Sequence, residues 1–172
     1  MADQRTELPF AQALLDAVEL FDELRIRYAL VGGVAAMYYG RARFTEDVDF
    51  VAVTGHAQTL AAHPDAMKAH HFDPSCTWKL YHQSGVEIDL WKDEHCDGIV
   101  SRSRVADLAG RQVRIAEPHD LIAMKLRAGR LQDDYDISEI LRGTSINDET
   151  VRPLVTAQEF AHYQEIKRRA AR

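Results

Sequence analysis

The chain has 172 residues, 46% of them hydrophobic and 28% charged, with a formal net charge of −6 at pH 7 when histidine is counted as neutral. This length suits one domain that buries well over half of the surface exposed by its unfolded form. The negative balance argues against a general polynucleotide-binding surface, and no apolar stretch approaches the length needed to cross a bilayer, so we expect no membrane role.

The first half of the chain alternates predicted helices and strands. Apolar residues recur every three or four positions from Phe10 to Leu24, which predicts an amphipathic helix packed on a sheet, and Leu8-Pro9 marks its start. Hydrophobic patterning predicts the other elements of this half. Their ranges are 28–31 (strand), 33–39 (helix), 47–53 (strand) and 55–70 (helix, with Leu60 and Met67 in the core).

The second half predicts a hairpin, one further strand and then helices throughout. The hairpin turns at residues 83–85, whose Ser-Gly pair is a turn signal. Glu117-Pro118 starts a helix with proline in its first turn, and Thr156 and Glu159 form a capping box for the last helix. The predicted ranges are 77–82 and 86–91 for the hairpin strands and 110–115 for the next strand. The helical part that follows begins with a helix at 117, includes a helix that ends near 142, and finishes with a last helix that begins at 156.

Two acids, Asp47 and Asp49, stand one residue apart in an otherwise apolar run. A strand places residues i and i+2 on one face, so their Cβ atoms would lie about 6–7 Å apart. Like charges at about 6 Å repel by roughly 3 kcal/mol at an effective dielectric of about 20, and a divalent cation would remove that repulsion. The alternative interpretation is a turn and cap ahead of a strand, where Asp is also favoured.

Two other features accompany the acid pair. Gly32-Gly33 lies at a predicted strand-to-helix turn, where glycine lets the backbone approach a ligand and the helix N-terminus offers N–H groups to an anion such as phosphate. Residues 86–91 alternate at period two, which puts Asp89 and Trp91 on one face. A third acid is therefore expected on a second strand.

These motifs resemble the nucleotidyltransferase superfamily, whose signature is a Gly-Gly or Gly-Ser turn, a pair of acids separated by one apolar residue, and a third acid on a later strand. Within it the chain looks most like the AbiEii-type toxins and related small bacterial proteins. The resemblance covers about residues 28–142, and Gln132 departs from it, because a basic residue often stands there. The matching segments are residues 32–35, Gly40, residues 43–50, residues 120–126 and residues 133–137.

The resemblance implies an α/β fold, a nucleotidyltransferase-like small mixed sheet flanked by helices, with that domain over residues 1–142 and a helical C-terminal appendage over 143–172 packed on it. It also implies metal-dependent transfer of a nucleoside monophosphate from a nucleoside triphosphate to an acceptor hydroxyl. Asp47, Asp49 and Asp89 would hold two Mg²⁺ or Mn²⁺ ions, which align the acceptor with the α-phosphate and neutralise the leaving pyrophosphate. Asp89 would also receive the acceptor proton.

Further site residues follow from the resemblance and from position on the helices. Lys125 falls on one side of its helix with Leu121 and Ile122, so it would point inward and stabilise negative charge on the transferred group. Asp133 and Asp136 would orient that lysine or the nucleotide base. The alternative for all three charged residues is an ordinary solvated helix surface. The residues that would contact the triphosphate are Gly32, Gly33, Arg43 and Thr45.

The possible functions differ in which molecule accepts the nucleotide. The resemblance implies transfer to RNA such as tRNA, or to a protein hydroxyl, by a toxin whose partner is an antitoxin protein. A second function is an antibiotic or small-molecule nucleotidyltransferase, for which an acidic cleft suits a cationic acceptor. Two functions without catalysis also fit: a nucleotide-binding module with the same fold, and a structural protein whose acid pair belongs to a turn. The presence of all three acids favours catalysis.

Eight histidines and two cysteines invite a zinc interpretation. Their spacings do not match structural zinc patterns, and the oxygen-rich acids favour magnesium or manganese instead. The chain shows neither a Cys-x-x-Cys pattern nor a secretory leader, which indicates reduced thiols and a cytoplasmic location. The zinc candidates are His70, His71, His82, His95 and Cys96.

Overall fold

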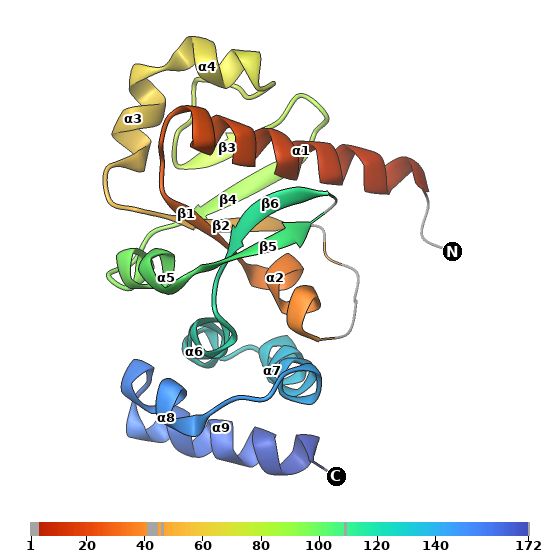
Figure 1. Cartoon of the computed structure of the whole chain (residues 1–172), viewed down its shortest axis with the longest axis vertical. Coiled ribbons are helices and arrows are strands. Elements are labelled where there is room, and N and C mark those ends of the chain that lie inside the picture. Colours follow the sequence, from red (N-terminus) through yellow and green to blue (C-terminus); the bar gives the residue numbers. More distant parts are fainter. Residues whose placement is uncertain (1–3, 41–44, 46, 109, 172) are drawn as a thin grey trace.

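The computed structural model describes residues 4–40, 45, 47–108 and 110–171. Its centre is a six-stranded mixed sheet with the strand order β3-β4-β2-β1-β6-β5 (Figure 1). Neighbouring strands are antiparallel except for the parallel pairs β1/β6 and β2/β4. The strands are β1 (Tyr28–Val31), β2 (Val48–Ala52), β3 (Lys79–Tyr81), β4 (Glu87–Trp91), β5 (Arg104–Leu108) and β6 (Arg111–Ile115).

Helices cover the sheet and extend the molecule below it in the view of Figure 1. The first, third and fourth helices lie with the sheet in the upper part of that view, and the last four helices form the lower part. Within the described residues, no helix combines the length and apolar character needed to cross a membrane. The helices are α1 (Gln4–Glu23), α2 (Gly32–Tyr39), α3 (His56–Ala62), α4 (Pro64–Ala69), α5 (Cys96–Arg102), α6 (Pro118–Ala128), α7 (Leu131–Gly143), α8 (Asp148–Val151) and α9 (Ala157–Ala170), with a 3-10 turn, η1, over Arg152–Leu154.

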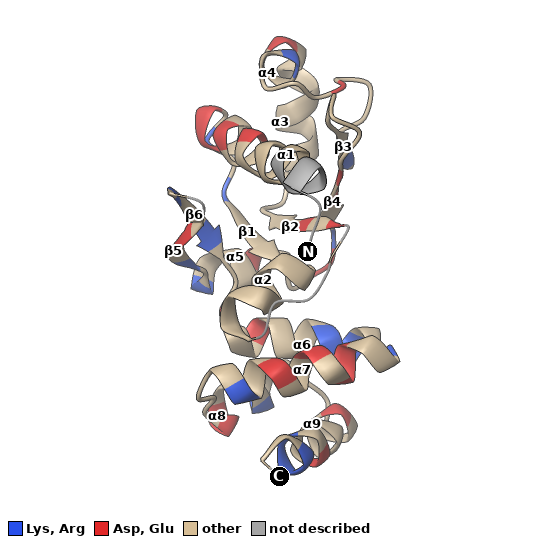
Figure 2. Cartoon of the chain, turned by 90° about the vertical axis from the view of Figure 1, so that its right-hand side faces the viewer, with Lys and Arg blue, Asp and Glu red and all other residues tan. Residues whose placement is uncertain are grey.

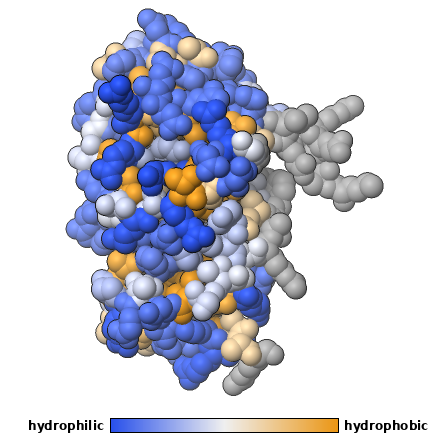
Figure 3. All heavy atoms as spheres, in the orientation of Figure 1, coloured by the Kyte–Doolittle hydropathy of each residue, from blue (hydrophilic) through white to orange (hydrophobic). Residues whose placement is uncertain are grey.

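Aromatic side chains join α1 to the sheet. The Phe21 ring lies 5.2 Å from that of Tyr28 and 5.3 Å from that of Phe50, measured between ring centroids. Leu60 and Met67 are fully buried, as predicted. On the face shown in Figure 3, hydrophobic residues appear in small groups among hydrophilic ones. The main apolar surface is therefore inside, where the α1 stripe meets the strands.

Two predicted helices differ from the observed ones. The first helix begins at Gln4, so Pro9 lies inside α1, where its missing N–H removes one backbone hydrogen bond near the helix start. The predicted helix over 55–70 is two helices, because proline disfavours the helical conformation of the residue before it and is well suited to a first helical position. His63 accordingly leaves the helix and Pro64 starts α4. Hydrophobic patterning did not predict α5 or β5.

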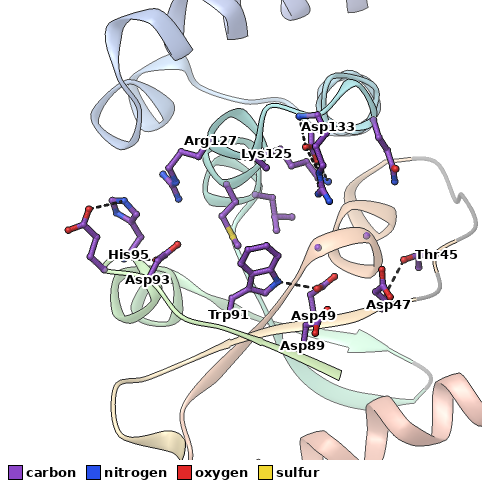
Figure 4. Close-up of a pocket in the computed structure, with 18 residues that line it drawn as sticks. Thr45, Asp47, Asp49, Asp89, Trp91, Asp93, His95, Lys125, Arg127 and Asp133 are labelled. Carbon is purple, nitrogen blue, oxygen red and sulfur yellow. Dashed lines mark hydrogen bonds and ion pairs between the residues drawn. The ribbon is translucent and has the colours of Figure 1, made fainter. Parts of the chain in front are cut away.

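The C-terminal helices pack on the rest of the chain through α7. This helix contacts α2 on one side and α9 on the other. A Cβ on Gly143 would lie 2.0 Å from the carbonyl oxygen of Tyr39, so only glycine permits the approach of α7 to the end of α2. Tyr163 and Ile166 of α9 belong to the same hydrophobic core as the sheet. This packing brings α6 and α7 opposite the face of the sheet that carries the acids (Figure 4).

Candidate active site

The three predicted acids come together on one face of the sheet, at the two neighbouring interior strands β2 and β4. Asp49 lies in β2 and Asp89 in β4, and the parallel pairing of these strands places the two residues opposite each other. Asp47 immediately precedes β2, and its carboxylate is near enough to act electrostatically on Asp49. Figure 4 shows the three side chains grouped beside Trp91. The alternation predicted for β4 is confirmed, with Ile88 and Leu90 buried on the opposite face.

The turn from β1 into α2 lies directly against Asp49. Gly32 has φ +67°, and a Cβ at this position would lie 2.1 Å from Asp49 Oδ2 and 2.7 Å from its Cγ. An L side chain would therefore be strained by the backbone and would displace the carboxylate. Gly33, one residue later, lines the same cavity. Glycine is required here because β2 brings an acid into contact with the start of a helix.

Asp49 is an electrostatically costly carboxylate. Burial raises the pKa of Asp49, the hydrogen bond from Trp91 lowers it, and the charges of Asp89 and Asp47 raise it again, with a net upward shift. The Trp91 indole donates through Nε1 to Asp49 Oδ1 over 3.0 Å. Unfavourable charge that is concentrated on three neighbouring acids is the arrangement that a bound cation would relieve.

Lys79, which sequence analysis did not single out, contacts the third acid. It stands opposite Asp89 in the antiparallel β3/β4 pair, and its Nζ lies 3.3 Å from Asp89 Oδ1 and 2.5 Å from Glu87 Oε2. The hydrogen bond to Glu87 is the main reason why the pKa of Lys79 is raised, and Asp89 adds to it. The predicted hairpin could have identified Lys79, because the register of its two strands determines which residue faces Asp89.

Lys125 projects from α6 on the opposite side of the site. Its Nζ donates to Asp136 Oδ2 over 2.6 Å and lies 3.5 Å from Asp133 Oδ1. All three residues are buried, with Lys125 only 7% exposed, so none of them is part of a solvated helix surface. The two acids of α7 therefore hold the lysine. Figure 2 shows α6 and α7 next to each other, with basic positions on α6 and acidic positions on α7.

A second basic residue, Arg130, contacts the acid at the start of α7. Its Nε and Nη2 donate to the two carboxylate oxygens of Asp133 over 2.9 and 3.2 Å. Burial raises the pKa of Asp133, but the hydrogen bonds from the Arg130 side chain and backbone outweigh this effect, and the net shift is downward. Gln132, which departs from the resemblance noted in the sequence, also lines the cavity. Arg130 supplies a cation two residues earlier on the same wall of the cavity.

One cavity of about 690 Å³ unites these groups. One side carries acids of the sheet, and the other carries three basic side chains together with Asp133, which pairs with two of them. Acids for a cation and bases for an anion suit a ligand that combines phosphates with a coordinated cation. Thr45 also lines it and donates through Oγ1 to the carbonyl oxygen of Asp47 over 3.3 Å. Arg43 lies outside the described residues, and Asp136 reaches the cavity only through Lys125. The acids that line the cavity are Asp47, Asp49, Asp89, Asp93, Glu94 and Asp133, and the bases are Lys125, Arg127 and Arg130.

The three carboxylates of the site are ligands suited to magnesium or manganese. Carboxylate oxygens from Asp47, Asp49 and Asp89 are the ligand type that these hard cations prefer. In this structure two of these carboxylates have other partners: Asp49 accepts from Trp91, and Asp89 lies beside Lys79. Within the described part of the chain, the only three His, Cys, Asp or Glu ligand atoms that lie within 4.8 Å of one another belong to residues elsewhere in the fold.

Sequence comparisons do not place the chain in a family. No protein-family model matches it, and no curated protein matches it significantly.

Solved structures do share its fold. An antigenic nucleotidyltransferase-like protein from Paracoccidioides brasiliensis superposes with a TM-score of 0.58 at 20% identity, covering 92% of this chain and 86% of that one. The antibiotic-resistance factor ANT(2'')-Ia gives a TM-score of 0.60 at 15% identity over 92% and 95% of the two chains. The lincosamide antibiotic adenylyltransferase LnuA, in a lincomycin-bound structure, gives 0.54 at 15% identity over 77% and 96%. The chain therefore has a nucleotidyltransferase fold, which confirms the predicted fold class.

Proposed function

We propose that this protein is a metal-dependent nucleotidyltransferase that moves a nucleoside monophosphate from a nucleoside triphosphate to an acceptor hydroxyl. The observation that carries the proposal is the arrangement of one cavity. Three carboxylates lie on one face of the sheet, a glycine turn touches the middle carboxylate, and a basic wall from α6 and α7 lies opposite them. The shared fold supports the same assignment.

Asp47, Asp49 and Asp89 would hold Mg²⁺ or Mn²⁺ in this reaction. When bound, the cation would neutralise triphosphate charge and lower the pKa of the acceptor hydroxyl. Asp89 takes the proton from that hydroxyl as its oxygen bonds to the α-phosphorus. The bond from the α-phosphorus to the bridging oxygen breaks, and pyrophosphate leaves.

The remaining residues position the triphosphate. Gly32 and Gly33 line the cavity at the start of α2, where backbone N–H groups lack helical partners and would bind a phosphate. Lys125, held by Asp136, places a positive charge on the opposite wall, and Arg130 adds a second.

The resemblance to AbiEii-type toxins suggests an acceptor hydroxyl on a cellular RNA such as tRNA or on a protein, with an antitoxin protein as regulator. A second candidate is an antibiotic acceptor, as in the adenylyltransferases that share the fold. Asp93 and Glu94 favour it, because both line the cavity beyond β4 and would attract a polycationic drug.

Thermal unfolding with Mg²⁺ or Mn²⁺ and each of the four nucleoside triphosphates tests the nucleotide site. A ligand at about 100 times its dissociation constant stabilises the native state by about 2.7 kcal/mol, which raises the midpoint. We expect a metal-dependent rise that Asp47→Asn/Asp49→Asn abolishes and that the exposed control Asp65→Asn retains. Absence of a rise with every nucleotide would contradict nucleotide binding. Binding without transfer of a radiolabelled α-phosphate to any acceptor would favour the non-catalytic module.

Expression in a bacterial host separates the two acceptor classes. A toxin acting on a cellular hydroxyl should slow growth in the absence of drug, and Asp47→Asn/Asp49→Asn should relieve the arrest. A drug-modifying enzyme should leave growth unchanged and raise resistance to its antibiotic. Purified protein incubated with total RNA or with a drug panel and labelled nucleotide then identifies the acceptor directly.

A further inference from the structure

A cluster of metal-ligand side chains lies outside the cavity, between α1 and the β3–β4 hairpin. Asp16 of α1 is at its centre. Its Oδ2 lies 3.0 Å from Nδ1 of His71, which follows α4, and 2.9 Å from Nε2 of His82, which follows β3. All three ligand atoms lie within 4.8 Å of one another, and none of the three residues lines the cavity. Segments far apart in sequence thus converge on one carboxylate.

Two of the three groups are buried and have further hydrogen-bond partners that orient them. The side chains of Asp16 and His82 are 6% and 5% exposed. Gln12 Nε2 donates to Asp16 Oδ1 over 2.6 Å, and His82 Nδ1 lies 2.7 Å from Ser84 Oγ. Metal ligands in proteins characteristically have such outer partners, which set the ring orientation and tautomer of histidine. The backbone N–H of Ser84 also donates to His82 Nδ1 over 3.2 Å, so without a metal the ring proton is on Nε2, which donates to Asp16. Zinc at Nε2 would displace that proton to Nδ1, where Ser84 Oγ can accept it.

The third group, His71, is held by an uncommon backbone conformation. Its φ is 65°, in the left-handed region that non-glycine residues rarely adopt. The N–H of Gln83 donates to its carbonyl oxygen over 2.9 Å, so the hairpin fixes this turn. The neighbouring His70 instead contacts Glu23 over 2.7 Å. The His71 side chain is 55% exposed, which leaves one side of the cluster open to solvent.

We propose that Asp16, His71 and His82 bind one Zn²⁺ ion, with water at the open fourth position. Two imidazole nitrogens and one carboxylate oxygen form a ligand set suited to zinc, whereas magnesium prefers oxygen alone. Tetrahedral ligands at about 2.0 Å from zinc are about 3.3 Å apart. The two separations from Asp16, 2.9 and 3.0 Å, would therefore open by a few tenths of an ångström. The two histidine nitrogens, which lie within 4.8 Å of each other, would have to reach the same spacing.

The ligands of the ion would tie α1 to the turn after α4 and to the hairpin. The open fourth position would distinguish this site from the closed, four-ligand sites typical of structural zinc. Without an ion, the same residues form a hydrogen-bonded clamp in which the two histidines donate to Asp16. Both arrangements join the same elements, so thermal stability alone does not separate them. Only the zinc site binds a transition metal with a fixed stoichiometry and a tetrahedral spectrum.

Cobalt serves as the spectroscopic probe. Metal-free full-length chain carrying Asp47→Asn/Asp89→Asn, which removes two cavity acids, is titrated with Co²⁺ and then with Zn²⁺ in excess Mg²⁺. We expect one Co²⁺ per chain with the intense visible bands of tetrahedral coordination, displacement by one equivalent of Zn²⁺, and a raised unfolding midpoint. Asp16→Asn and His71→Gln should each weaken binding by at least about tenfold, and Gln12→Leu by about tenfold.

The matched control is His63→Gln, which alters an exposed histidine whose Nδ1 lies 2.8 Å from the carbonyl oxygen of Thr59 in the preceding helix α3. Its cobalt affinity should equal that of the parent. Because His71 is half exposed, His71→Gln should keep the fold, which circular dichroism checks. A folded chain that binds neither Co²⁺ nor Zn²⁺, or whose binding survives both Asp16→Asn and His71→Gln, would overturn the proposal and leave the hydrogen-bonded clamp.

Discussion

Gly32 and Asp49 approach so closely that a Cβ on the glycine would lie 2.1 Å from the carboxylate oxygen Oδ2. We expect Gly32→Ala to lower the free energy of unfolding by about 1–2 kcal/mol through its left-handed backbone. Displacement of Asp49 should also reduce nucleotidyl transfer by about 100-fold. Urea unfolding and a labelled-nucleotide assay measure the two effects.

Gly110 provides the control for this substitution. It also has a left-handed backbone, with φ +78°, but a Cβ would meet no atom within 4 Å. Gly110→Ala should therefore show a similar loss of stability with full transfer activity. Equal activity of the two alanine variants would disprove a role for the contact between Gly32 and Asp49.

Removal of Lys79 should strengthen metal binding by Asp47, Asp49 and Asp89. Its ammonium lies 3.3 Å from Asp89, so it competes with a cation for that carboxylate. Partly exposed pairs contribute about 0.2–1 kcal/mol, which corresponds to at most about a fivefold fall in the Mg²⁺ concentration for half-maximal activity of Lys79→Met. Activity titrations at low ionic strength measure the change. The control is Lys68→Met, which alters an exposed lysine on α4 and should leave the Mg²⁺ requirement unchanged. Weaker Mg²⁺ binding by Lys79→Met would show that Lys79 supports the metal site instead of competing with the metal.

Lys125→Met should affect both stability and transfer. The substitution breaks the buried ion pairs of Lys125 with Asp136 and Asp133, and the loss of one partner of a buried pair lowers the free energy of unfolding by about 3–5 kcal/mol. Lys125→Met/Asp136→Leu should recover a substantial part of this stability but none of the transfer activity. Urea unfolding and single-turnover transfer assays separate the two effects. Recovery of activity along with stability would indicate that Lys125 acts only through folding.

The C-terminal helix should lose stability in acid. Burial raises the pKa of Asp148, but hydrogen bonds from Lys167, Gln164 and Tyr163 outweigh it and lower the pKa below its usual value. Because the folded-state pKa is lower than the unfolded one, Asp148 stabilises the fold above about pH 4. This contribution disappears as the pH falls through the folded-state pKa.

Asp148→Asn should therefore be less stable than wild type at pH 7, and the difference should shrink as the pH falls below about 4. Urea unfolding between neutral and acid pH measures it. Glu149→Gln, the exposed neighbour, should show little difference at any pH. If the stability difference between Asp148→Asn and wild type grew on acidification, the pKa of Asp148 could not be lowered in the folded state.

Local patterns determined much of the fold. The buried strand before Gly32, the start of α6 at Pro118 and the capping box of Thr156 and Glu159 appear as predicted. Each depends on hydrogen bonds or backbone preferences within a few residues. The split at Pro64 followed the same local rule. By contrast, β5 has a mostly exposed edge pattern without clean alternation, and patterning did not detect it.

The sequence by itself determined the acid spacing, the glycine turn and the class of chemistry they suggest. Only the tertiary structure decided which charges face one another: Lys79 opposite Asp89, Arg130 on Asp133, and two histidines on Asp16. Side-chain periodicity states which face of an element a residue occupies, but not which element packs against that face. The partner depends on strand register and helix packing over distances that no local pattern encodes, and here those contacts decide the charge of both proposed metal sites.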